Sequence, residues 1–61
     1  MRKRQRDILA ALENLGGEAT TRQIAERTGF NVNGVSQSLG ALYKHVQRLG
    51  GNAGEIKWKL R

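Results

Sequence analysis

Apolar side chains recur at helical spacing in three successive stretches of the chain and at alternate positions near its end. Because side chains three and four residues apart share one face of a helix, the first stretch predicts an amphipathic helix that begins among Arg4–Asp7. Its stripe consists of Ile8, Leu9, Ala11, Leu12 and Leu15. Gly16 and Gly17 are expected to end this helix, since glycine tolerates the left-handed conformation that helix C-termini favour.

The stretch Thr20–Leu42 predicts two further helices joined by a turn. The first of them, about 21–28, follows Thr20 or Thr21, either of whose hydroxyls can cap it. Gly29 turns the chain, and Asn31 can cap the third helix, about 32–43. At about 100° per residue, one sector of this third helix is apolar and must face the core: Val32, Val35, Leu39 and Leu42. The opposite side carries a polar line of Asn33, Gln37, Gly40 and Lys44.

The period changes from helical to two in the last part of the chain. In Glu55–Arg61, EIKWKLR, apolar and basic residues alternate, which predicts a strand with one buried face and one basic face. Trp58 is expected in the core, since Ile56 and Leu60 share its face. His45–Leu49 is the candidate partner strand, and 50–54 the loop of a β-hairpin. Upstream, Glu18–Thr20 is a short connector and a candidate third strand. Taken together, the three helices and the hairpin predict one α+β domain over 1–61.

Composition narrows the class of partner. Eleven Lys and Arg against five Asp and Glu give a net charge of +6, which favours a polyanion, nucleic acid before an anionic membrane. Charge that serves only solubility is the alternative. The first six residues, MRKRQR, are interpreted as a basic arm.

The same composition argues against several classes of site. With no cysteine and one histidine, a disulfide framework and a Cys/His zinc site are excluded, and we expect no metal, cofactor or small-molecule ligand. No apolar run approaches the roughly 18 residues of a bilayer span, so a cytoplasmic protein with no membrane partner is expected. A hydrolytic triad would need Ser36 or Ser38, His45 and a carboxylate in a pocket. So small a domain offers little concave interior, and we therefore do not expect the protein to be an enzyme.

The order helix, connector, helix, turn, helix and basic hairpin resembles the winged helix-turn-helix family of bacterial and archaeal DNA-binding proteins. The resemblance is carried by Ile24-Ala25, Gly29, Val35-Ser36, Leu39 and Leu42, and by the hairpin GGNAGEIKWKL, which is similar to the wing and its returning strand. It covers nearly the whole chain. It implies a small winged-helix fold, sequence-preferring binding of double-stranded DNA with helix three in the major groove, and a role as a small transcriptional regulator associated with the nucleoid.

Different residues are expected to contact the DNA backbone and the bases, since cations release counterions from phosphates whereas base edges give specificity. The candidate backbone contacts are Thr21, Arg22, Lys44, Arg48, Lys57 and Lys59. The candidate base contacts are Asn31, Asn33, Ser36 and Gln37. The arm residues are expected to enter a neighbouring minor groove: Arg2, Lys3, Arg4 and Arg6. Because helix three lacks arginine, the usual reader of guanine, we expect weak discrimination tilted toward A·T-containing sites.

Other interpretations of the same residues stay open at this point. Asn31 could serve only as a helix cap, and Asn33 and Gln37 could be ordinary solvated side chains. A protein-interaction adaptor would explain the fold but not the charge. Non-specific binding of RNA or of the nucleoid would use the arm and the wing more than helix three. A monomer or a weak homodimer formed on DNA is expected, because the chain has no helix beyond the first to spare for a dimer interface.

Overall fold

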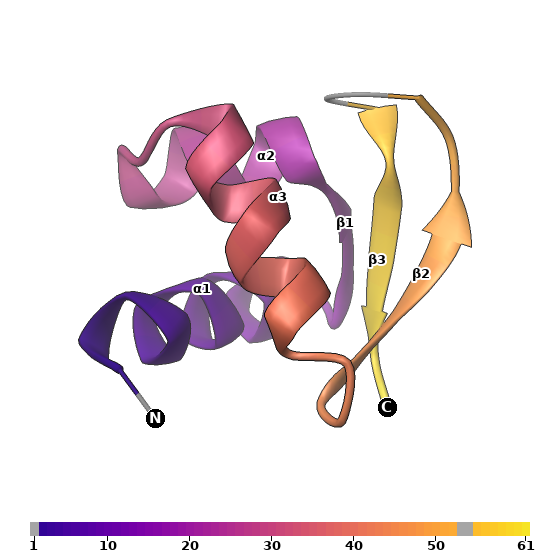
Figure 1. The fold of residues 1–61 in the computed structure, drawn as a ribbon, viewed down its shortest axis with the longest axis horizontal. Helices are drawn as coiled ribbons and strands as arrows, with labels where there is room; N and C mark the ends of the chain where they lie inside the picture. Colours follow the sequence, from indigo (N-terminus) through magenta and orange to yellow (C-terminus); the bar gives the residue numbers. More distant parts are fainter. Residues whose placement is uncertain (1, 53–54) are drawn as a thin grey trace.

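The computed structural model describes residues 2–52 and 55–61, which form a small α+β fold (Figure 1). In chain order the elements are α1 (Lys3–Asn14), β1 (Glu18–Thr20), α2 (Thr21–Thr28), α3 (Val32–Ala41), β2 (Val46–Gly50) and β3 (Lys57–Leu60). The helices pack against one another on one side of an antiparallel sheet, with α3 crossing in front of α1 and α2 in Figure 1. This architecture is compatible with a winged helix.

The sheet has the strand order β1-β3-β2, so the last strand of the chain is its centre. Both neighbours of β3 are antiparallel to it, with Ala19 and Arg48 each opposite Trp58. The predicted third strand at Glu18–Thr20 is therefore confirmed. The hairpin strands are displaced slightly from the prediction: β2 starts at Val46 and includes Gly50, and β3 starts at Lys57. A register shift between Arg48 and Gly50 lets the five residues of β2 pair with the four residues of β3.

Helix α1 begins earlier than predicted and ends where predicted. At its start the backbone N–H of Arg2 donates to Oε1 of Gln5 (3.2 Å), which satisfies a donor next to the first turn. At its end Gly16 and Gly17 have φ of 94° and 85°. The N–H of Gly17 donates to the carbonyl of Leu12 (2.9 Å) and that of Gly16 to Glu13 (3.0 Å). This is the six-to-one and five-to-two pattern of a Schellman ending, which needs residues that accept positive φ.

Side-chain caps fix the starts of α2 and α3. The hydroxyl of Thr20 accepts from the backbone N–H of Gln23 (3.1 Å), while the Thr20 N–H donates to Gln23 Oε1 (2.9 Å). This reciprocal pair identifies Thr20, rather than Thr21, as the cap. Asn31 caps α3 by accepting from the N–H of Asn33 (2.8 Å), as predicted. Between the two helices Gly29 takes the left-handed conformation at φ 79°, which is why the chain turns there.

The core consists of apolar side chains from every element. Its members are Ile8, Ala11, Leu12, Ala19, Ile24, Ala25, Val35, Leu39, Leu42, Val46, Ile56 and Trp58, with Leu9, Leu15, Phe30, Val32 and Leu60 packed around them. The predicted stripes of the first and third helices and the core position of Trp58 are thereby confirmed. On α3 the buried sector leaves the side around Gln37 facing outward.

Thr21 joins the helices to the sheet from inside the core. Its side chain is fully buried; its hydroxyl accepts from Nε1 of Trp58 (2.7 Å) and donates to the carbonyl of Ile56 (3.3 Å). Its backbone N–H also donates to Ile56 (2.9 Å). The prediction that Thr21 contacts phosphate is therefore wrong, because both of its donors are used inside the protein.

Helix α3 ends at Ala41, two residues earlier than predicted. The chain turns over 42–45, where the N–H groups of His45 and Val46 both donate to the carbonyl of Leu42 (2.8 and 3.0 Å). Arg61 reinforces this turn, since its Nε donates to the carbonyls of Tyr43 (2.8 Å) and Val46 (3.1 Å). Lys44 is thus placed on the turn and does not continue the polar line of α3.

Candidate nucleic-acid interface

The exposed face of α3 is polar and made mostly of small side chains. Asn33 and Gln37 are exposed, Ser36 is half-buried, and Gly40 adds no side chain. Gln37 lies opposite the centre of the buried sector at about 100° per residue, so it projects furthest from the body. A helix of ten residues is about 15 Å long and presents nearly three turns of this face.

A groove runs along one flank of α3, between that helix and the first turn of α1. It has a volume of about 510 Å³, and its lining residues are Arg2, Arg4, Gln5, Gly34, Gln37, Ser38 and Ala41. The two arginines belong to α1 and its cap, whereas the small and amide side chains belong to α3. The groove therefore brings together two residues of the predicted arm, Arg2 and Arg4, and one predicted base contact, Gln37.

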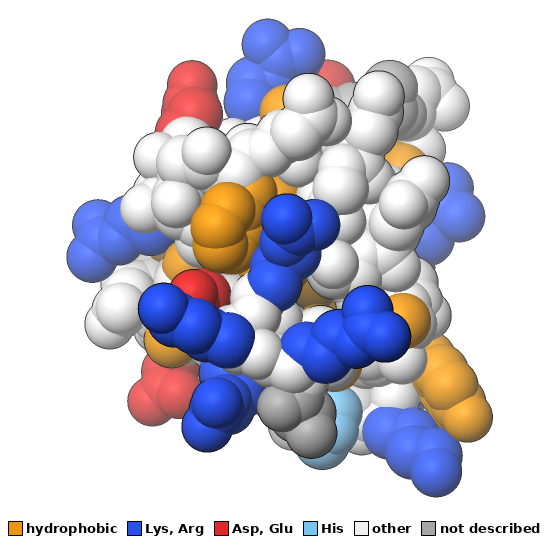
Figure 2. Space-filling model, turned by 60° about the vertical axis from the view of Figure 1, so that its left-hand side comes forward, with side chains coloured by type: hydrophobic (Ala, Val, Ile, Leu, Met, Phe, Trp, Pro, Cys, Tyr) orange, Lys and Arg blue, Asp and Glu red, His pale blue; other side chains and the backbone are white. Residues whose placement is uncertain are grey.

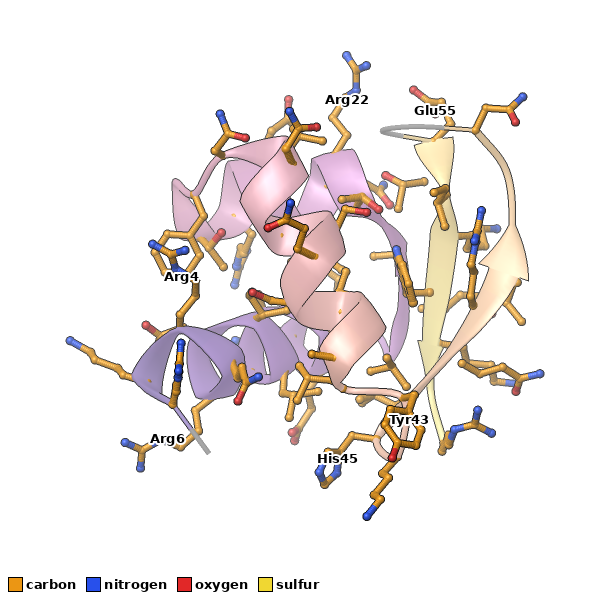
Figure 3. The ribbon with its side chains drawn as sticks, in the orientation of Figure 1. Arg4, Arg6, Arg22, Tyr43, His45 and Glu55 are labelled. Carbon is orange, nitrogen blue, oxygen red and sulfur yellow. The ribbon has the colours of Figure 1, made fainter. Side chains whose placement is uncertain are left out.

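A second groove of about 400 Å³ borders the other flank of α3. It is lined by Leu39, Gly40, Tyr43, Val46, Gln47, Arg48, Trp58 and Arg61. Arg48 is paired with Trp58 across the sheet and lies on the same face as that side chain. Tyr43, which is 63% exposed, lies just after the end of α3 and lines both this groove and a third hollow, which Lys44 and His45 also line (Figure 3).

The charges around α3 are of one sign. The described residues that line these three hollows include five cations and no Asp or Glu: Arg2, Arg4, Lys44, Arg48 and Arg61. Figure 2, which brings the start of α1 toward the viewer, shows several Lys and Arg side chains on the face around that helix start, with Asp and Glu side chains also visible there. Two of the acids lie elsewhere in ion pairs: Glu18 with Lys57 (3.2 Å) and Glu55 with Arg22 (3.6 Å). An anion beside α3 would therefore meet cations without a competing carboxylate.

The predicted basic arm is not an arm from Lys3 onward. Lys3, Arg4 and Arg6 lie in the first turn of α1, since the capping contact of Gln5 and the good helix propensity of Lys, Arg and Gln extend the helix to Lys3. A helical segment is too wide to enter a minor groove as an extended arm does. This corrects the predicted mode of contact for these residues. Arg2 and Arg4 instead line the groove beside α3, and Met1 lies outside the described residues.

The predicted backbone contacts separate into two groups. Lys57 and Lys59 alternate with Ile56 and Trp58, so they lie on the sheet face that points away from the helices, and Lys57 is paired with Glu18. The structure does not bring them together with the polar face of α3. Arg22 lies at the start of α2 and points toward Glu55 beyond the end of β2 (Figure 3). Of the predicted wing loop at 50–54, Gly50 belongs to β2, and 53–54 lie outside the described residues.

Several residues of these grooves were not predicted from the sequence. Ser38 and Gly34 line the first groove, and Arg61 lines the second. The helical angle could have found Ser38, which lies about 100° from Gln37. Arg61 had no such signal, because its place depends on hydrogen bonds to the turn at 42–45.

Two further kinds of site are absent from residues 2–52 and 55–61. No group of three or more His, Cys, Asp or Glu side chains is arranged to hold a metal ion there. No helix in that part of the chain is long and apolar enough to cross a bilayer.

Comparison with known proteins gives no relative from which a role could be carried over. No protein-family model matches the chain, and neither a curated protein nor a solved structure shows significant similarity to it. The functional inference therefore rests on the residues and the geometry of the surface around α3.

Proposed function

We propose that the chain is a winged-helix protein that binds double-stranded DNA, with α3 in the major groove. The observation that carries the proposal is the surface around α3: a polar face opposite the core, bordered on both flanks by grooves whose charged lining residues are all cations. A major groove about 12 Å wide admits one α-helix with phosphates on either side. The arrangement of amides on the helix and cations beside it matches that pattern.

Base contacts are assigned to the exposed face of α3. Asn33 and Gln37 are exposed, and amide side chains pair bidentately with N6 and N7 of adenine. Asn31 uses its side-chain carbonyl oxygen to cap the helix, and Ser36 is half-buried. Because α3 carries no arginine, the proposal includes a modest preference for A·T-containing duplexes. A role as a small transcriptional regulator follows only if such a preference exists.

Backbone contacts are assigned to the cations that line the grooves: Arg2, Arg4, Lys44, Arg48 and Arg61. Neutralising about five phosphates predicts a slope of roughly −4 to −5 when the logarithm of the association constant is plotted against the logarithm of salt concentration. Fluorescence anisotropy of a labelled duplex, titrated at several salt concentrations, measures this slope. A slope near zero would reject the proposal.

The role of α3 is tested by the double variant Asn33→Ala/Gln37→Ala. Both side chains are exposed, so the fold is expected to survive, as circular dichroism would verify. The variant is expected to bind A·T-containing and G·C-only duplexes equally, whereas the parent chain prefers the first. Unchanged preference would exclude α3 as the reading element. Stronger binding to RNA or single strands than to duplex DNA would favour the non-specific alternative, and no binding to any of them would favour the adaptor.

A further inference from the structure

Arg4 is held at one place on the surface by an aromatic ring. Its guanidinium carbon lies 5.3 Å from the centroid of Phe30, within the range of a cation–π contact. Phe30 follows the turn at Gly29 and packs against the core with part of its ring exposed. In Figure 3 the side chain of Arg4 extends from α1 toward this turn, whereas that of Arg6 points away from the body. The ring therefore limits the orientations open to Arg4.

The same guanidinium overlies the first turn of α3. A Cβ atom built on Gly34 would come within 3.8 Å of Nη1 of Arg4, an ordinary van der Waals distance. Arg4 thus forms one wall of the groove whose other wall is provided by Gln37, Ser38 and Ala41. Asp7, one turn further along α1, lines a different hollow together with Arg27.

We propose that this groove binds a phosphodiester of the DNA strand that borders α3, with Arg4 as the contacting cation and Phe30 as the residue that positions it. The inference rests on the proposed function, which already assigns Arg4 to the DNA backbone, and adds the place of that contact and the positioning role of Phe30. A guanidinium offers two parallel N–H donors to phosphate oxygens. Because the ring already restrains the side chain, less conformational entropy is lost when phosphate binds. The hydroxyl of Ser38 supplies a further donor across the groove.

The first test compares Arg4→Ala with Arg6→Ala. Both remove one positive charge from an exposed position of α1, but Arg6 does not line the groove. We expect Arg4→Ala to weaken duplex binding about five- to tenfold and to reduce the salt slope by about 0.9, the contribution of one phosphate contact. Arg6→Ala is expected to change affinity less than about twofold, because distant exposed charges are largely screened.

The second test concerns Phe30. Phe30→Leu keeps an apolar side chain but removes the ring, and is expected to weaken binding about two- to threefold with an unchanged salt slope, since Arg4 still reaches phosphate. Phe30→Tyr keeps the ring and is expected to bind as the parent does. The double variant Arg4→Ala/Phe30→Leu should bind as Arg4→Ala alone does. NMR of the free protein gives a separate readout: the Arg4 side-chain protons are shifted upfield by the ring in the parent and not in Phe30→Leu.

The outcomes distinguish this inference from the function on which it rests. Equal losses in Arg4→Ala and Arg6→Ala, with strong binding by the parent chain, would reject the groove contact and leave DNA binding intact. Additive effects in the double variant would reject the positioning role of Phe30. Failure of the parent chain to bind duplex DNA would reject the proposed function and this inference together. If Phe30→Leu does not fold, the comparison of Arg4 with Arg6 still decides the contact.

Discussion

Thr21 is a polar residue whose side chain is buried in the core and forms its hydrogen bonds there. A threonine at the start of a helix is typical of an exposed cap, and nothing adjacent to it in the sequence indicates otherwise. Its partners, Trp58 and Ile56, belong to the other end of the chain and reach it only once the sheet has formed. The local sequence therefore identified the helix start but not which of two threonines caps it.

Replacing Thr21 by valine is expected to destabilise the fold. The isosteric side chain removes the acceptor of the Trp58 indole N–H, and leaving a buried donor unsatisfied costs about 1–3 kcal/mol in the free energy of unfolding. Urea denaturation measures the loss. Trp58→Phe removes the donor, so the cost of Thr21→Val should shrink in that background. An equal cost in both backgrounds would contradict a hydrogen bond as the cause.

The cap at Thr20 provides a matched comparison one residue away. Thr20→Ala removes the acceptor of the Gln23 N–H, and loss of such a cap costs about 0.5–2 kcal/mol. Because the bond lies at an exposed helix start, we expect a smaller loss of stability than for Thr21→Val, again measured in urea. A larger loss would mean that the two threonines have been assigned the wrong roles.

At the scale of elements, periodicity predicted which faces are buried. Val35, Leu39 and Leu42 are all buried, as the angular sector of the third helix required. The start of the first helix was placed too late, because its opening turn is basic and carries no apolar residue to mark a face. The packing of α1 against α3 could not be predicted from the sequence either. The groove between them depends on the angle at which the two helices cross, and the apolar stripe of one helix does not specify that angle.

Gly40 is expected to lower the stability of α3, because glycine has a poor helix propensity. A Cβ built there meets nothing within 4 Å, so Gly40→Ala is expected to stabilise the protein by about 1 kcal/mol through helix propensity. Thermal denaturation measures the gain. Gly29→Ala should have the opposite sign, since that residue has φ +79°. A loss of stability in Gly40→Ala would contradict the open space around this position.

At the scale of the whole molecule, the sequence shows an excess of positive charge but does not show how that charge is distributed over the surface. The net charge of +6 implied a polyanionic partner, and the structure adds that the cations around α3 are not matched by carboxylates in the same grooves. The lysines of β3 lie on the opposite side of the sheet from the helices, one of them paired with Glu18. Folding thus separates charges that are indistinguishable in the sequence.

The central claim, that the surface around α3 binds duplex DNA, is tested most directly by NMR. An amide spectrum of the isotope-labelled protein is titrated with a short duplex of mixed sequence. We predict that the largest shift changes fall on Asn33, Gln37 and the neighbouring residues of α3, on Arg4 at the start of α1, and on Arg48 of β2. Changes confined to Lys57 and Lys59 on the outer face of the sheet, or no changes at all, would contradict the account.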